Sequence, residues 1–273
     1  MSSVPFTMVG AAGRMGRTII DLSWSYGAAD GRSLRLVGAL ENSESPVVGT
    51  DILREGASTG IRITDQASSA LEGAAVVIDF SKPENTLAIS RVCREKKTAM
   101  VVGTTGFSES QRKQLEEAAA DIPILISPNM SVGVNLLFFL TGLAARRLAE
   151  GYALEIVDIH HGHKKDAPSG TALRLKEVLL EGANRTEDDV VYGRHGLTGE
   201  RPPREIGVHT LRGGDVVGDH TVLFLGEGER IELTHRATSR NTFASGALRA
   251  ALFVVAQKPG LYTMSDVLDL GSP

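Results

Sequence analysis

The sequence has few of the features that would place it outside the cell or in a membrane. It contains one cysteine, Cys93, among 273 residues, so an internal disulfide is excluded and a reducing, cytoplasmic setting is expected. Its longest apolar run, residues 132–145, is interrupted by Asn135 and Thr141, and it is too short and too polar to span a bilayer. The N-terminal residues lack a basic region followed by a long apolar stretch, so no signal peptide is expected.

The sequence also lacks a strong excess of charge of either sign. Its 29 lysines and arginines and 33 acidic residues give a formal net charge of −4. This balance gives no reason to expect a nucleic acid or an acidic membrane surface as a partner. No internal repeat or long linker is present, and the length predicts either two domains or one large α/β domain.

A glycine-rich turn near the N-terminus is the first motif with a chemical meaning. The apolar residues 6–9 lead into GAAGRMGR, in the order strand, glycines, helix that a dinucleotide-binding loop requires. In such a loop the glycines allow a tight turn, close approach of a diphosphate and close packing of the helix, whose N-terminus binds the diphosphate. The G-x-x-G-x-x-G spacing is weak by itself, since a turn that binds nothing can share it. The cofactor contacts predicted here are Gly10, Ala11, Ala12, Gly13, Arg14 and Met15.

An acidic residue at the end of the second predicted strand strengthens the cofactor prediction. Residues 34–40 form this strand, and Glu41 follows it at the place where an acid accepts the ribose hydroxyls. A carboxylate there would repel a 2′-phosphate, and Asn42 carries no charge to offset the repulsion, so the sequence favours NADH. Arg14 and Arg17 are close enough in sequence to supply a cation, so use of NADPH stays open.

Strands and helices continue to alternate through the first half. Apolar runs at 75–80, 98–102 and 122–126 predict strands buried on both faces. Such a pattern predicts a right-handed, mostly parallel sheet of the Rossmann type, with ligands at the carboxyl ends of its strands. Gly103, Thr104 and Thr105 would then touch the nicotinamide end of the cofactor, although GTTG can also be a simple turn.

The second half has a different pattern, which predicts a mixed α+β domain. Its expected elements are a helix at 133–150, a strand at 153–159, a helix at 171–180, a strand-rich tract at 205–235 and a helix at 243–256. We therefore expect a first domain of residues 1–130, completed by 241–273, and a second domain of residues 131–240.

The segment DIHHGHKKDAPSGT, residues 158–171, is the densest in titratable groups. It joins a predicted strand to a predicted helix, and reactive side chains are often found on such loops. Its histidines and lysines offer proton donors and cations, while the amides of Gly170 and Thr171 at a helix N-terminus offer an anion site. Three histidines can also bind a metal, but the adjacent lysines would repel a dication, so no metal is predicted.

These segments together resemble the family of 4-hydroxy-tetrahydrodipicolinate reductases, also called dihydrodipicolinate reductases. The resemblance extends over the whole chain, in the family's order. The segments that carry it are GAAGRMGR (10–17), VVGTTGF (101–107), SPNMSVGVN (127–135), EIVDIHHGHKKDAPSGTAL (155–173) and HRATSRNTFASGAL (235–248).

The resemblance implies a Rossmann-like cofactor domain, a second domain for substrate and tetramerisation, and the NAD(P)H-dependent reduction of a small cyclic dicarboxylate in lysine biosynthesis. It makes His160 a proton donor or acceptor and Lys164 the proton donor. It assigns the substrate carboxylates to His161, Gly170 and Thr171.

Further cofactor contacts also follow from the resemblance, namely Ser127, Pro128, Asn129, Met130 and Arg240. The remaining histidines are interpreted as structural: His163, which we expect to bond to the backbone, and His195, His209, His220 and His235.

Two other functions stay open at this point. A sugar dehydrogenase of the Gfo/Idh type has a Rossmann half, and Ser81-Lys82-Pro83 is a superficial match to its lysine motif, but the PSGT turn argues against a neutral polyol. A nicotinamide-sensing regulator would usually carry a DNA-binding module, and no basic helix-turn-helix segment is visible.

Overall fold

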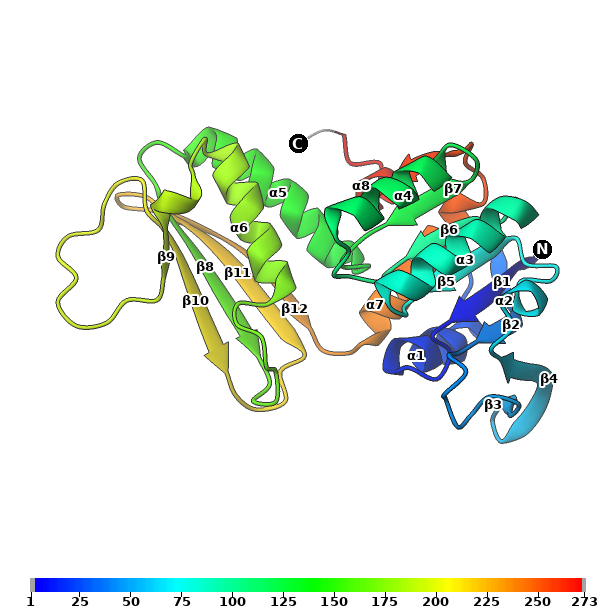
Figure 1. Ribbon diagram of the computed structural model, residues 1–273. Coiled ribbons are helices and arrows are strands. Elements are labelled where there is room, and N and C mark those ends of the chain that lie inside the picture. Colours follow the sequence, from blue (N-terminus) through cyan, green and yellow to red (C-terminus); the bar gives the residue numbers. More distant parts are fainter. Residues whose placement is uncertain (1–2, 272–273) are drawn as a thin grey trace. The chain divides into compact units, whose positions relative to one another are not determined.

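The computed structural model describes residues 3–271, which form two compact units (Figure 1). Unit 1 contains the described residues up to Val132 together with Asn241–Asp269, and unit 2 contains Gly133–Arg240 with the described residues after Asp269. The predicted fold class, a Rossmann-like parallel sheet plus a second mixed α/β part, is confirmed. Within residues 3–271, no helix combines the length and the apolar character needed to cross a membrane.

Unit 1 is built on an eight-stranded sheet with the strand order β13-β7-β6-β5-β1-β2-β4-β3. The strands are β1 (Ser3–Val9), β2 (Ser33–Leu40), β3 (Asp51–Arg54), β4 (Ala57–Thr64), β5 (Val76–Asp79), β6 (Ala99–Val102), β7 (Pro123–Ile126) and β13 (Gly260–Tyr262). Neighbouring strands are parallel, except that β3 and β4 form an antiparallel hairpin.

Helices cover both faces of this sheet, which explains why its central strands are mostly apolar on both faces. The helices are α1 (Arg14–Ser23), α2 (Ala67–Ala70), α3 (Pro83–Lys96), α4 (Glu109–Ala119), α7 (Asn241–Val254) and α8 (Met264–Val267). One core contains residues of α1 and α7, and the other contains residues of α3 and α4. The predicted capping box of Ser108 and Gln111 is confirmed at the start of α4, and Cys93 is a fully buried thiol of α3.

Unit 2 is built on a five-stranded mixed sheet with the order β12-β11-β8-β10-β9. Its strands are β8 (Ala153–His160), β9 (Val190–Tyr192), β10 (Ile206–Arg212), β11 (Gly218–Leu225) and β12 (Arg230–Ala237). Its helices are α5 (Val132–Leu148) and α6 (Gly170–Gly182), with a short 3-10 turn, η1 (Glu187–Asp189). Both α5 and α6 pack on one face of the sheet (Figure 1).

The alternation of side chains along β8 determines where the polar residues of unit 2 lie. Leu154 and Ile156 are fully buried in the core beneath α5 and α6. Because side chains alternate with a period of two in a strand, Asp158 and His160 continue the same face. The end of β8 therefore places a carboxylate and an imidazole beside the N-terminus of α6.

Candidate active site

The glycine-rich turn of unit 1 lies between β1 and α1. Gly10 has a φ of 77°, and a Cβ there would lie 2.8 Å from the carbonyl oxygen of Phe80. A Cβ at Gly16 would lie 2.1 Å from the carbonyl oxygen of Gly10, so glycine is required for this approach of α1 to the loop. No side chain caps α1 at Gly13. The first amides of α1 are therefore placed to bind an anion.

Glu41 follows β2 and reaches back to this turn. Its Oε2 accepts a hydrogen bond from the amide of Ala12 at 2.9 Å, and its Oε1 accepts one from the amide of Asn42 at 3.0 Å. Arg14 and Arg17 are exposed. The structure thus brings the carboxylate at the end of β2 to the predicted diphosphate loop.

The GTTG segment follows β6 and packs against the carboxyl end of β5. The amide of Gly103 donates to the carbonyl oxygen of Asp79 at 2.8 Å, and a Cβ at Gly103 would lie 2.4 Å from the Phe80 ring. The Thr104 hydroxyl oxygen is buried and accepts from the amide of Ser81 at 3.1 Å. Thr105 is exposed at the end of the segment.

A fully buried carboxyl group, Asp79, lies beneath this segment. Its Oδ1 accepts from the amide of Ser81 at 2.9 Å and lies 3.5 Å from the Thr104 hydroxyl. Its Oδ2 has no hydrogen-bond partner among the described residues. Burial raises the pKa of Asp79, and the bonds from Ser81, Thr86 and Thr104 only partly oppose this rise.

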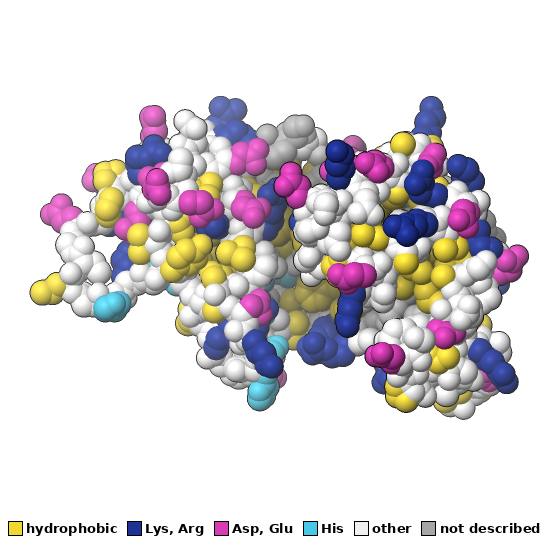
Figure 2. Space-filling view, viewed as in Figure 1, with side chains coloured by type: hydrophobic (Ala, Val, Ile, Leu, Met, Phe, Trp, Pro, Cys, Tyr) yellow, Lys and Arg dark blue, Asp and Glu magenta, His cyan; other side chains and the backbone are white. Residues whose placement is uncertain are grey.

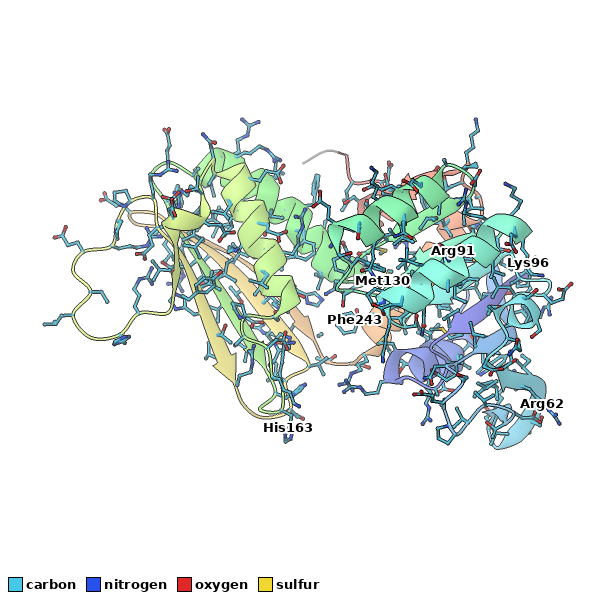
Figure 3. All side chains as sticks on the ribbon, in the orientation of Figure 1. Arg62, Arg91, Lys96, Met130, His163 and Phe243 are labelled. Carbon is cyan, nitrogen blue, oxygen red and sulfur yellow. The ribbon has the colours of Figure 1, made fainter. Side chains whose placement is uncertain are left out.

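The segment after β7 has its shape set by internal hydrogen bonds. The Ser127 hydroxyl donates to the carbonyl oxygen of Asn129 at 2.7 Å, and the amide of Ser131 donates to Asn129 Oδ1 at 2.9 Å. Pro128 is exposed, and Met130, labelled in Figure 3, is buried in the core that contains α1 and α7.

The histidine-lysine loop of unit 2 begins at the end of β8. His160 is buried, and its Nδ1 lies 3.0 Å from Asp158 Oδ1. The Lys164 ammonium lies 2.8 Å from an oxygen of Asp166. Burial and the charge of His163 lower the pKa of His161, with a smaller contribution from the exposed Arg240. The predicted proton donor, proton acceptor and substrate ligands thus come from one segment.

His163 does not fit its structural interpretation. It is exposed at the outer end of the loop, and no hydrogen bond joins its ring to the backbone within residues 3–271 (Figure 3). Its ring centroid lies 6.1 Å from that of His161. The expectation of a bond to the backbone was wrong because the loop projects beyond the sheet. Figure 2 shows histidine and basic side chains gathered at this end of unit 2.

The helix that follows the loop begins with a well-defined cap. Ser169 is the N-cap of α6, and its hydroxyl oxygen accepts from the amide of Ala172 at 3.1 Å. A Cβ at Gly170 would meet no protein atom within 4 Å. Because the first amides of a helix have no partners within it, the Gly170 amide is placed to bind an anion, and the half-buried Thr171 follows it.

Asp158, which the sequence did not single out, is the centre of this site. Its carboxylate accepts from the amide of Ser169 at 3.0 Å and from the Ser169 hydroxyl at 2.8 Å. It also lies 3.1 Å from Arg212 Nη2 and 3.2 Å from His220 Nε2. Burial would raise the pKa of Asp158, but His160, His220 and Ser169 outweigh it and hold the pKa well below its ordinary value.

The same residues meet the spacing of a metal site. One ligand atom each from Asp158, His160 and His220 lie within 4.8 Å of one another. The Arg212 guanidinium donates to the same carboxylate at 3.1 Å. Its positive charge would repel a dication bound there. The absence of a metal therefore stays our prediction. A hollow of about 500 Å³ on unit 2 adjoins this site, because Ala167 and Pro168 of the 158–171 segment and Thr210, which pairs with Asp158, line it together with Tyr192, Gly193 and Val208.

Two family descriptions together match almost the whole chain. Residues 4–130 match the N-terminal part of dihydrodipicolinate reductase, and residues 133–268 match its C-terminal part. The chain belongs to the dihydrodipicolinate reductase family. The predicted family, and with it the prediction of an oxidoreductase, is confirmed, and the sugar dehydrogenase alternative gains no support.

Relatives named 4-hydroxy-tetrahydrodipicolinate reductase align along nearly their full length. That of Anaeromyxobacter dehalogenans strain 2CP-1 is 51% identical over 266 residues, which cover 96% of this chain and 97% of the relative. That of Thiobacillus denitrificans is 50% identical over 270 residues, which cover 98% of this chain and 99% of the relative. Both cover the two units of this family member.

A solved structure shares the fold. The dipicolinate-bound dihydrodipicolinate reductase from Paenisporosarcina sp. TG-14 superimposes with a TM-score of 0.78 at 22% identity. The match covers 96% of this chain and 98% of that one. At this identity the likeness bears on the fold alone.

Proposed function

We propose that this family member reduces 4-hydroxy-tetrahydrodipicolinate to tetrahydrodipicolinate, with loss of water, in the biosynthesis of diaminopimelate and lysine. One observation in unit 2 carries the proposal. A buried carboxylate-imidazole pair, Asp158 and His160, lies beside the N-terminus of α6. A proton-transfer group next to an anion site is what a small dicarboxylate substrate requires.

The residues of unit 1 fit a nicotinamide dinucleotide. The turn between β1 and α1 packs so closely that a Cβ at Gly10 or Gly16 would clash with the backbone, and the N-terminus of α1 carries no side-chain cap. When bound, a reduced nicotinamide supplies the hydride. The residues proposed to hold the diphosphate are Gly10, Ala11, Ala12, Gly13, Arg14 and Met15. Those proposed for the nicotinamide end are Gly103, Thr104, Thr105, Ser127, Pro128, Asn129 and Met130, with Arg240 as a further contact.

We propose NADH as the preferred cofactor. Glu41 places its carboxylate at the loop, where it can accept ribose hydroxyls once it releases the Ala12 amide. The same carboxylate opposes a 2′-phosphate. Arg14 and Arg17 are exposed and could reduce this repulsion, so NADPH is expected to bind more weakly rather than not at all.

The substrate carboxylates are assigned to His161, Gly170 and Thr171. The open space at Gly170 leaves its amide accessible to an anion. Lys164 is assigned as the proton donor, and it must first leave Asp166, to which its ammonium is paired at 2.8 Å. A substrate carboxylate can replace Asp166 as the counter-ion and keep Lys164 protonated until transfer.

A homotetramer in the cytoplasm completes the proposal. The face of the unit 2 sheet turned away from α5 and α6 carries Val157, Ile159, Leu211 and Leu223, and Leu211 is 48% exposed. These apolar side chains lie among polar ones such as Glu155 and His209, and exposed apolar groups on a sheet face favour association with further copies of the chain. The buried, unpaired thiol of Cys93 agrees with a reducing compartment.

Replacement of the assigned proton donor tests the proposal. Lys164→Ala should lower kcat by a factor of about 10² to 10⁴, because general acid catalysis contributes that much. Its dissociation constant for NADH should be unchanged. Turnover on enzymatically generated substrate and fluorescence titration with NADH measure the two quantities.

Lys165→Ala is the matched control, because Lys165 is the neighbouring lysine and is exposed. It should keep near-normal kcat. In the wild-type protein, pyridine-2,6-dicarboxylate should compete with the substrate. Near-normal turnover in Lys164→Ala would show that the proton comes from another group, and no competition by the dicarboxylate would contradict the substrate class.

A further inference from the structure

We infer that Asp158 is a positioning residue that holds the His160 ring and the N-terminus of α6 in one arrangement. The inference rests on the proposed function, which assigns these two groups to the substrate. It is drawn from the geometry around one fully buried carboxylate. Asp158 itself lies beneath the loop and acts through its neighbours.

The carboxylate of Asp158 joins four elements of unit 2. Ser169 at the start of α6 donates to it twice, through its amide and its hydroxyl. Arg212 at the end of β10 donates to Oδ2 at 3.1 Å. His220 of β11 and His160 of β8 present ring nitrogens 3.2 and 3.0 Å from Oδ1. A displacement of the Asp158 carboxylate would therefore change the contacts of all four elements.

The carboxylate selects the proton position on His160. A lone pair on Nδ1, 3.0 Å from a carboxylate oxygen, would be repelled, whereas a proton there is attracted. Nδ1 has no well-aligned hydrogen-bond partner, so the attraction acts through charge at short range. The neutral ring therefore carries its proton on Nδ1 and its lone pair on Nε2, the division of roles that a carboxylate imposes on a catalytic histidine in hydrolases.

The other nitrogen of His160 faces a position without a side chain. A Cβ at Gly218, the first residue of β11, would lie 3.0 Å from His160 Nε2. The glycine leaves room for Nε2 to receive or deliver a proton. Asp158 thus lies beside Nδ1 of the ring, and Gly218 leaves no side chain beside Nε2.

Ser169 links the same carboxylate to the anion site. Its hydroxyl donates its single proton to Asp158 and accepts from the Ala172 amide. His220 Nε2, 3.1 Å from the Ser169 oxygen, must then be the donor in that contact. The cap of α6, and with it the amides of Gly170 and Thr171, is therefore fixed relative to the His160 ring.

Arg212 connects the histidine-lysine loop to Asp158. Besides its bond to Asp158, its Nη2 donates to the carbonyl oxygen of Asp166 at 2.8 Å. Asp166 is the residue to which Lys164 is paired. The charged and titratable groups around His160 are therefore Asp158 on its own strand, Arg212 on β10, His220 on β11 and the adjacent His161.

Asp158→Asn tests the inference, because it keeps the shape of the side chain and removes its charge. The fraction of neutral His160 rings that are protonated on Nδ1, measured by ¹⁵N NMR without substrate, should decrease. The kcat should fall by roughly 10² to 10⁴. Binding of pyridine-2,6-dicarboxylate should weaken several-fold, whereas the affinity for NADH should not change.

Glu155→Gln is the matched control. Glu155 is a buried carboxylate of the same strand, three residues earlier, where it pairs with Arg194 and Arg201. This variant should leave the proton position on His160 and the kcat unchanged. Asp158→Glu retains the charge and should restore the NMR signature at least in part.

An unchanged proton position on His160 in Asp158→Asn would overturn the inference, as would an equal change in Glu155→Gln. The NMR measurement needs no turnover. Wild-type protein with the expected NMR signature but no reduction of the dicarboxylate would contradict the proposed function and would still support the positioning of His160 by Asp158.

Discussion

Two buried aspartates, one in each unit, have surroundings that shift their pKa values in opposite directions. Asp79 and Asp158 are both fully buried and lie at or near the ends of strands. Asp79 is bonded to an amide and a distant hydroxyl, and its Oδ2 has no hydrogen-bond partner among the described residues. Asp158 is surrounded by Ser169, Arg212 and two histidine rings. Burial raises the pKa of Asp79, while the pKa of Asp158 is lowered in spite of burial.

The contrast shows that the number and charge of the donors, not burial, decide whether an interior carboxyl group is ionised. It also separates two structural tasks. The carboxylate of Asp158 organises charged groups that we assign to the substrate. The carboxyl group of Asp79 supports the turn of Gly103 and Thr104. Three substitutions test this difference between the two aspartates.

The largest effect is expected from Asp158→Ala. It leaves Arg212 and the amide of Ser169 without their buried acceptor, and loss of one partner of a buried ion pair costs about 3–5 kcal/mol. Native-state hydrogen exchange of the β8 amides should report this loss of stability in unit 2. The low pKa of Asp158 means that its contribution is present above the ordinary aspartate value of about 3.9 and is lost as the pH falls further.

The difference between wild type and Asp158→Ala should therefore be constant from about pH 5 to 8 and should shrink below about pH 4. A difference that instead grew on acidification would mean that Asp158 is protonated in the folded protein, and the contrast with Asp79 would disappear.

A smaller effect of opposite pH dependence is expected from Asp79→Asn. The raised pKa of Asp79 means that ionisation destabilises the folded state, a cost that appears as the pH rises above about 3.9. The amide of Asn has no such cost and can still accept from Ser81. The variant should match wild type near pH 4 and become more stable than wild type as the pH rises toward 8.

Urea unfolding followed through the single tryptophan, Trp24, measures this effect, because Trp24 packs against the core of unit 1. Lower stability of Asp79→Asn across the whole pH range would show that the carboxylate has a partner that outweighs its burial.

The smallest effect is expected from Thr104→Val. The hydroxyl accepts from the Ser81 amide and donates to Asp79, and a net hydrogen bond contributes about 1 kcal/mol. The same urea assay should show a loss of that size, and the affinity for NADH should fall a few-fold because the segment loosens. Thr105→Val, at the exposed neighbour, should leave stability unchanged. Equal losses in both variants would mean that the Thr104 hydroxyl has no special role.

Most of the fold was predictable, because its signals are local. Apolar runs such as 75–80 and 98–102 correspond to β5 and β6, and the glycine turn correctly preceded α1. The hairpin of β3 and β4 was not predicted, and neither were the short strands β9 and β13. β13 has three residues, and its pairing with β7 depends on the return of α7 from the far end of the chain.

The site was predictable only where its residues are neighbours in sequence. The period of two in β8 could have placed Asp158 on the face of His160, and this signal was overlooked. His220 was interpreted as structural because nothing near it in sequence suggests a site. Only the antiparallel register that pairs His220 with Asp158 brings it there.

Cys93 gives this protein a reporter that needs no label. The thiol is fully enclosed, and both burial and the nearby Asp79 raise its pKa, so the reactive thiolate is suppressed in the closed fold. An alkylating reagent can therefore modify the chain only when the core beneath α3 opens. The rate of that modification therefore reports how often the core of unit 1 around Cys93 opens under native conditions.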